Sequence, residues 1–87
     1  PEPAVAPAVP VANGIVLHPD LGYPDLRIAI EYEGDGHRTS KRQWHHDIER
    51  RELMEDAGWR VIRVTSDDLF VHPDRLVARI LRVLAGR

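Results

Sequence analysis

Three acidic residues in the first half of the chain, Asp20, Glu31 and Glu33, have a spacing that suits a metal site. Glu31 and Glu33 are two residues apart in a segment of alternating character, so in a β-strand both side chains leave the same face. If the strand that ends at Asp20 pairs antiparallel with that segment, Asp20 converges on the glutamates. Three such oxygen ligands suit Mg²⁺ or Mn²⁺, and the bound ion can activate a water and stabilise charge on a phosphate.

The same carboxylates have a second interpretation. They also fit a solvated strand face on which Glu31 pairs with Arg27 or with an arginine of a neighbouring helix. Spacing alone leaves both interpretations open.

A basic stripe follows the acidic segment. Arg38, Lys41 and Arg42 open a predicted helix, and Arg42, His46 and Arg50 are spaced i, i+4, i+8 on one of its faces. Such a stripe, together with the free N–H groups at a helix start, suits contacts to DNA phosphates. The alternative is a face that only makes the surface soluble.

Histidines offer one candidate for proton transfer. His37 lies in the loop after Glu33 and is a candidate general base, since an imidazole can take a proton near neutral pH; an exposed loop histidine is the alternative. His45 and His46 are adjacent on the helix and point about 100° apart, which argues against a shared zinc ion.

Two further pairs in the helix region have structural interpretations. Asp47 and Arg51 are i, i+4 neighbours and are predicted to form an ion pair. Trp44 and Trp59 are predicted to be core anchors.

The elements that must position these residues begin with strands. Asn13-Gly14 predicts a two-residue hairpin turn before a short strand at Ile15-Val16-Leu17. Gly22-Tyr23-Pro24-Asp25 has the composition of a turn. Leu26 to Glu33 alternates strictly in polarity and is the clearest strand of the sequence.

Two helices and one more strand follow. Ser40, with Gln43 three residues on, predicts a helix start with a capping box, and Gly58 predicts its end. Arg60–Val64 is rich in β-branched residues and predicts a strand. A 3.6-residue apolar stripe between Pro73 and Gly86 predicts a second helix. The predicted order is β-β-β-α-β-α, an α/β (α+β) fold.

Size and composition permit one small domain. The chain has 87 residues, 43% of them hydrophobic. We expect residues 1–10, with four of the seven prolines, to be a linker or edge strand, and residues 11–87 to be a single domain. Because the first residue is Pro, we expect the chain to be the C-terminal part of a longer protein, completed by a homodimer partner or by a missing N-terminal segment.

Charge and hydropathy narrow the class of protein. Residues 1–37 carry six acidic and one basic side chain, hence −5, and residues 38–87 carry eleven basic and eight acidic, hence +3. An acidic segment beside a basic one suits a cation site next to a polyanion site, although a mixed solvated surface has the same composition. The chain has no cysteine, no run of eighteen apolar residues and no signal-peptide pattern, so we expect a cytoplasmic protein with no membrane partner.

The order Pro19-Asp20, ten residues, then Glu31-Tyr32-Glu33 resembles the PD-(D/E)XK nuclease motif. The stretch from Glu31 through Gly-Asp-Gly to His37-Arg38, followed by Trp44, Asp47, Arg50, Arg51 and Gly58-Trp59-Arg60-Val61, resembles relatives of the very-short-patch-repair (Vsr) endonucleases.

This resemblance implies a restriction-endonuclease-like core, with a mixed sheet flanked by helices, that hydrolyses DNA phosphodiesters with a divalent metal. Asp20 then takes the place of the metal-binding aspartate, Glu31 the acidic position and Glu33 the place of the motif lysine. Glu33 departs from the motif because it accepts protons or binds metal instead of orienting water as a lysine does. His37 is the residue that would share that work.

The family core also begins with a helix, which would precede Pro1 and often carries another acidic residue. Two alternatives to an active endonuclease therefore stay open. One is a catalytically inactive nuclease-fold module that binds DNA or protein. The other is an interaction fragment whose second helix docks a partner.

Overall fold

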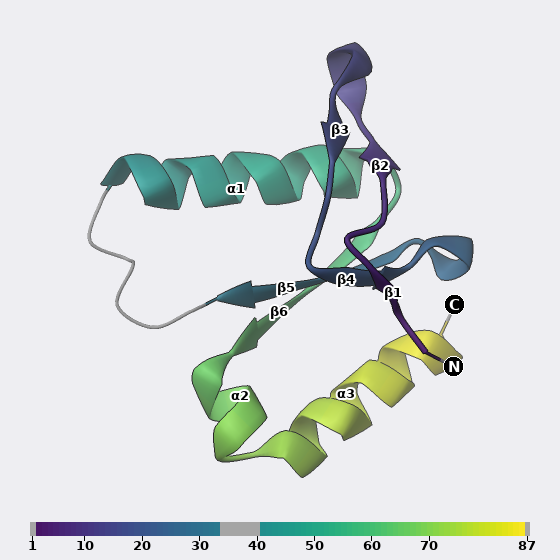
Figure 1. The fold of residues 1–87 in the computed structure, drawn as a ribbon, viewed down its shortest axis with the longest axis vertical. Helices are drawn as coiled ribbons and strands as arrows, with labels where there is room; N and C mark the ends of the chain where they lie inside the picture. Colours follow the sequence, from purple (N-terminus) through teal and green to yellow (C-terminus); the bar gives the residue numbers. More distant parts are fainter. Residues whose placement is uncertain (1, 34–40, 87) are drawn as a thin grey trace.

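Two six-residue strands lie side by side at the centre of the fold in the computed structural model, which describes residues 2–33 and 41–86 (Figure 1). In chain order the strands are β1 (Ala4–Val5), β2 (Val9–Pro10), β3 (Val16–Leu17), β4 (Leu21–Tyr23), β5 (Ile28–Glu33) and β6 (Arg60–Thr65). The helices are α1 (Lys41–Asp56), α2 (Ser66–Phe70) and α3 (Pro73–Ala85), with single 3-10 turns at Ala12–Gly14 and Pro24–Leu26.

Strand β5 is an inner strand of a four-stranded mixed sheet with the order β1-β4-β5-β6. It pairs antiparallel with β4, where Ile30 faces Leu21, and parallel with β6, where Ile30 faces Ile62. Its first three residues are buried, and its last three are partly or fully exposed. The C-terminal half of β5 is therefore the part of the sheet centre at which polar side chains can reach solvent.

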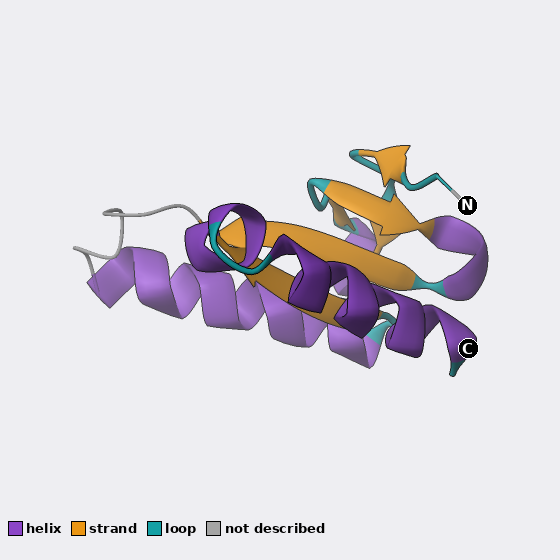
Figure 2. Cartoon of the chain, turned by 90° about the horizontal axis from the view of Figure 1, so that it is seen from below, coloured by secondary structure: helices purple, strands orange, loops and turns teal. Residues whose placement is uncertain are grey.

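Helices cover both faces of this sheet (Figure 2). Alternate residues of β5 supply the two cores, since successive side chains of a strand leave opposite faces. The core on the α1 side consists of Val9, Ala29, Met54, Trp59 and Val61. The core on the α3 side consists of Ile28, Ile30, Ile62, Val64 and Leu76. The predicted mixed sheet flanked by helices is confirmed.

The hairpin predicted at Asn13-Gly14 is confirmed, with a longer loop than expected. Strands β2 and β3 pair antiparallel, and Val11 N–H donates to Ile15 O at 2.8 Å across a three-residue loop. Asn13 and Gly14 have φ of 64° and 73°, the left-handed region that these residue types tolerate. The hairpin packs Val11 against the α1-side core.

Helix α1 ends at Asp56, and Gly58, predicted to stop it, follows two residues later with a φ of 92°. Trp59 N–H then donates to Met54 O at 3.0 Å, and Trp59 is buried in the core as expected. The predicted start at Ser40 lies outside the described residues. The prediction that Trp44 anchors the core is wrong, because its side chain is 50% exposed and meets the ring of His45 edge-on at 5.3 Å.

The predicted order β-β-β-α-β-α omits β1, β4 and α2. Gly22 and Tyr23, expected in a turn, lie in β4, and the chain turns one step later at Pro24–Leu26. β1 pairs with β4 at the edge of the sheet. Strands of two or three residues are too short to show an alternating pattern. The turn at residues 22–25 was therefore predicted from amino-acid composition alone, which does not reveal β4.

Helix α2 begins with a capping box that the sequence analysis missed. Thr65 N–H donates to Asp68 Oδ2 at 2.8 Å, and Asp68 N–H donates to Thr65 Oγ1 at 3.2 Å. The hydrogen bond from the Thr65 backbone, with help from the charge of Arg79, holds the pKa of Asp68 below its usual value. Of the helices described, none is long and apolar enough to span a membrane.

Gly22 is expected to tolerate no side chain, because β4 approaches both β5 and Pro7 there. A Cβ at this position would lie 2.8 Å from Ile28 O and 2.9 Å from Pro7 Cγ. Since Ile28 O is backbone within the sheet, Gly22→Ala should lower the free energy of unfolding by about 1–3 kcal/mol in urea titrations. Gly86→Ala is the control, because its nearest neighbour would be Arg82 O at 3.6 Å; equal stability of the two variants would contradict the clash.

Candidate active site

The acidic residues singled out in the sequence lie at the C-terminal end of β5, on the face that α1 covers. Glu31 and Glu33 share that face with the buried Ala29, because alternate residues of a strand point the same way. Asp20 directly precedes β4, and the pairing of Leu21 with Ile30 puts it beside Glu31 on the adjacent strand. Asp20 Oδ2 accepts a hydrogen bond from Tyr32 N–H at 2.8 Å, which ties it to β5.

A pocket of about 240 Å³ opens at this end of the sheet. It contains three carboxylates and two guanidinium groups, so most of its charge is balanced within the pocket. The residues that line it are Asp20, Glu31, Tyr32, Gln43, Asp47, Arg50 and Arg63.

Arg50 of α1 donates two hydrogen bonds to the carboxylate of Glu31. Its Nε donates to Oε1 at 3.3 Å and its Nη2 to Oε2 at 3.2 Å, while Nη2 also donates to His18 O at 3.0 Å. Both side chains are mostly buried, with exposed fractions of 23% for Arg50 and 19% for Glu31. The paired arrangement fixes the glutamate and joins α1 to β5 and to the segment before Asp20.

Arg63 of β6 holds the second glutamate. Its Nη2 donates to Glu33 Oε1 at 3.0 Å and lies 4.0 Å from Asp47 Oδ2. The predicted ion pair of Asp47 with Arg51 is wrong, because Arg51 pairs with Glu55 at 3.3 Å. Asp47 instead turns toward the pocket, where its Oδ1 accepts from Gln43 Nε2 at 3.1 Å.

The residues predicted to contact DNA or transfer protons have different surroundings in the structure. His37 and Arg38 lie outside the described residues. Lys41, Arg42 and His46 are exposed on α1. Arg50 does not belong to a free stripe, since it faces the sheet and binds Glu31.

Asp47 and Arg63 are pocket residues that the sequence analysis did not assign to the site. A signal for both was present. Arg63 is two residues after the core residue Val61 in an alternating strand, so it had to share the α1 face. Asp47 is three residues before Arg50 and therefore on the same side of the helix.

A model of the restriction-endonuclease-like family REase_MTES_1575 matches residues 5–84. The chain belongs to this family. The match covers the residues of both hydrophobic cores and all the residues that line the pocket. The predicted restriction-endonuclease-like domain is therefore confirmed, and the chain is a nuclease-like domain.

Two proteins of Mycobacterium tuberculosis are similar to this member of the family. They are uncharacterized protein MT2308 from strain CDC 1551 / Oshkosh and uncharacterized protein Rv2248 from strain ATCC 25618 / H37Rv, each 32% identical over 72 residues. The similarity covers 83% of this chain and 27% of each relative, so the chain spans about a quarter of their length. No solved structure matches the chain.

The donors in the pocket fit Mg²⁺ or Mn²⁺ in kind. Asp20 and Glu31 present carboxylate oxygens on adjacent strands, and the Oδ1 atom of Asp20 has no partner in the described part of the chain. Within residues 2–33 and 41–86, no three acidic or histidine side chains are grouped closely enough to hold one ion, so the three predicted ligands Asp20, Glu31 and Glu33 are not grouped around one ion site. Two carboxylates are sufficient for Mg²⁺, which keeps several waters and takes further ligands from a bound phosphate.

Proposed function

We propose that this domain is the nuclease part of a longer protein and hydrolyses DNA phosphodiester bonds with Mg²⁺ or Mn²⁺. The observation that carries the proposal is that Asp20 and Glu31, on neighbouring strands, line one open pocket of a restriction-endonuclease-like domain. The resemblance of Glu31-Tyr32-Glu33, His37 and the Gly58–Val61 segment to the Vsr endonuclease relatives supports DNA as the substrate.

Four of the residues that line the pocket, together with Glu33 and His37, have a part in this proposal. Asp20 and Glu31 hold the ion, which when bound supplies positive charge to the scissile phosphate and lowers the pKa of a water. Arg50 orients Glu31 through its two hydrogen bonds. Glu33, fixed by Arg63, and His37 are the groups proposed to accept the proton of the attacking water.

DNA contacts are proposed for the exposed start of α1. Lys41, Arg42 and His46 are exposed there, and Figure 1 shows the first turns of α1 and the C-terminal end of β5 at the same end of the molecule. Arg38, just before the helix, belongs to the same proposed set. Phosphate contacts at this end would bring the DNA backbone to the carboxylate pocket without reading base sequence.

The proposal is tested by incubating the purified chain with supercoiled plasmid DNA. Nicked or linear product is expected with Mg²⁺ or Mn²⁺, and none with excess EDTA. Because the curated relatives are longer than this chain, the assay is repeated on the longest natural form of the protein. Intact plasmid with both proteins and both metals would refute the nuclease proposal.

Metal ions should also stabilise the folded domain, because a cation relieves the repulsion between neighbouring carboxylates. At about a hundred times the dissociation constant, a bound ion adds roughly 2.7 kcal/mol to the free energy of unfolding. Denaturant titrations with and without Mg²⁺ measure this gain. Asp20→Asn should lose most of it, whereas Asp25→Asn, which changes an exposed aspartate outside the pocket, should keep it. An equal gain in both variants would contradict a specific site.

A second function is supported by the two arginine pairs. Arg50 and Arg63 already neutralise Glu31 and Glu33, which is also what a catalytically silent module for DNA or protein binding would contain. Plasmid that is bound but never cut, in the same assay followed by gel-shift electrophoresis, favours this alternative.

A further inference from the structure

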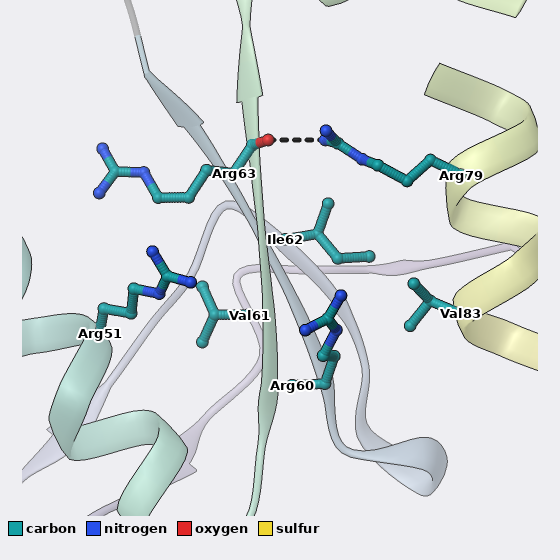
Figure 3. Close-up of a pocket in the computed structure, with 7 residues that line it drawn as sticks. All are labelled: Arg51, Arg60, Val61, Ile62, Arg63, Arg79 and Val83. Carbon is teal, nitrogen blue, oxygen red and sulfur yellow. Dashed lines mark hydrogen bonds between the residues drawn. The ribbon is translucent and has the colours of Figure 1, made fainter. Parts of the chain in front are cut away.

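The outer edge of β6 forms the floor of a second open trough, distinct from the carboxylate pocket. β6 is the last strand of the four-stranded sheet, and its free side faces a hollow of about 210 Å³ between α1 and α3 (Figure 3). The residues that line the hollow are Arg51, Arg60, Val61, Ile62, Arg63, Arg79 and Val83. We call this hollow the arginine trough.

Four arginines from three elements converge on the trough, and no acidic residue lines it. Figure 3 shows Arg51 reaching from α1 on one side of the strand and Arg79 from α3 on the other, with Arg60 and Arg63 on β6 between them. Four positive charges around one hollow repel one another, and an anion bound among them offsets this repulsion. The arrangement therefore suits a negatively charged ligand.

The arginines of the trough are only partly engaged in ion pairs within the chain. Arg51, Arg63 and Arg79 have carboxylate partners at 3.3, 3.0 and 3.9 Å, all outside the trough lining. Arg60 is exposed and has no ion pair with any described residue. It is the cation with the most freedom to meet a ligand.

Two donors in the trough arginines are buried and unsatisfied. The Nε atoms of Arg63 and Arg79 have no hydrogen-bond partner in the described part of the chain. Arg79 Nη2 donates to Arg63 O at 2.7 Å, which holds the Arg79 guanidinium across the strand edge. Both Nε atoms are closed to solvent, whereas the two side chains as a whole are 27% and 37% exposed, so a ligand in the trough would meet the outer N–H groups of these guanidiniums.

We propose that the arginine trough binds backbone phosphates of DNA away from the bond that is cut. This inference rests on the proposed function for its ligand. Arginine suits the ligand because its planar guanidinium binds phosphate with two hydrogen bonds. Arg63 lines both the trough and the carboxylate pocket, so a strand with one phosphate at the carboxylates passes directly to the four arginines.

Arginines on an edge strand have another recognised effect, which is to prevent pairing with a second sheet. That effect requires no ligand and no salt-dependent affinity. Removing one charge from the trough therefore separates the two roles.

The test is the salt dependence of binding to a fluorescently labelled DNA duplex, followed by anisotropy in EDTA so that no cleavage occurs. Each phosphate contact contributes about 0.9 to the slope of log K against log salt concentration. Arg60→Gln should reduce the slope by about 0.9, and Arg51→Gln combined with it by up to about 1.8. Arg60→Lys should retain the slope, because counterion release depends on charge.

Arg75→Gln is the matched control, since Arg75 is an exposed arginine of α3 that does not line the trough. Circular dichroism of each variant establishes that it is folded. Equal slopes for Arg60→Gln, Arg75→Gln and the parent chain would overturn the proposal, as would absence of any affinity of the parent for the duplex.

The outcome is distinguishable from failure of the nuclease proposal. A reduced slope in Arg60→Gln with no cleavage by the parent under any metal supports the trough and rejects the nuclease. Cleavage by the parent with an unchanged slope in Arg60→Gln rejects the trough alone.

Discussion

Glu31→Gln is expected to lower the rate of metal-dependent plasmid cleavage by at least about 100-fold. Removing a partner of a metal ligand already costs 10–100-fold in affinity or activity, and this change removes a proposed ligand itself. A neutral amide oxygen is a weaker ligand than a carboxylate for a hard cation. Initial rates of plasmid nicking at saturating Mg²⁺ measure the effect.

The substitution is informative because it removes the charge of the side chain and one of its two hydrogen bonds from Arg50, that from Nε, which an amide NH2 group cannot accept. The glutamine keeps the size of the side chain, and its amide oxygen can still accept a hydrogen bond from Arg50 Nη2, now 3.2 Å from Glu31 Oε2. Glu52→Gln is the control, since Glu52 is an exposed glutamate of α1 that does not line the pocket. Cleavage by Glu31→Gln at the rate of the control would remove Glu31 from the site.

The part of the site on β5 was predictable, because alternation along a strand fixes the face of the sheet to which each side chain points. Strict alternation from Leu26 to Glu33 placed Ile28 and Ile30 in one core and sent Glu31 to the opposite face, as observed. The predicted antiparallel neighbour for Asp20 is also found, although the strand that pairs with β5 begins just after Asp20 and not before it. Side-chain direction in a strand follows from chain geometry alone, so it needs no tertiary information.

Side chains whose roles depend on other elements were assigned less well. The four-residue spacing favoured an Asp47–Arg51 pair, but Arg51 has a second acidic residue, Glu55, one turn further on, and forms that pair. Trp44 was predicted to be a core anchor, but its side chain is 50% exposed. It lies in the first turns of α1, far in sequence from Met54, the single buried residue of that wholly described helix. Which part of a helix meets a sheet is set by packing, which the sequence pattern of α1 does not encode.

Met54→Ala is expected to produce the largest loss of stability among these variants. The Met54 side chain is 0% exposed and packs between α1 and the sheet with Ala29, Trp59 and Val61. Truncating a buried methionine costs about 2–5 kcal/mol, depending on how far the cavity collapses. A chain of 87 residues has a free energy of unfolding of about 4–13 kcal/mol, so the loss is a large fraction of the total. Urea titration followed by tryptophan fluorescence measures it.

The consequence of Met54→Ala should extend to the pocket, because Arg50 is one helical turn before Met54 on α1. If α1 packs less tightly on the sheet, the two hydrogen bonds of 3.2 and 3.3 Å from Arg50 to Glu31 become weaker. Hydrogen exchange should therefore become faster along α1 before global unfolding, while β5 remains protected. Leu81→Ala, at a position that is 56% exposed on α3, should change stability by no more than about 0.5 kcal/mol. If Met54→Ala is as stable as Leu81→Ala, the α1-side core does not hold the helix that orients Glu31.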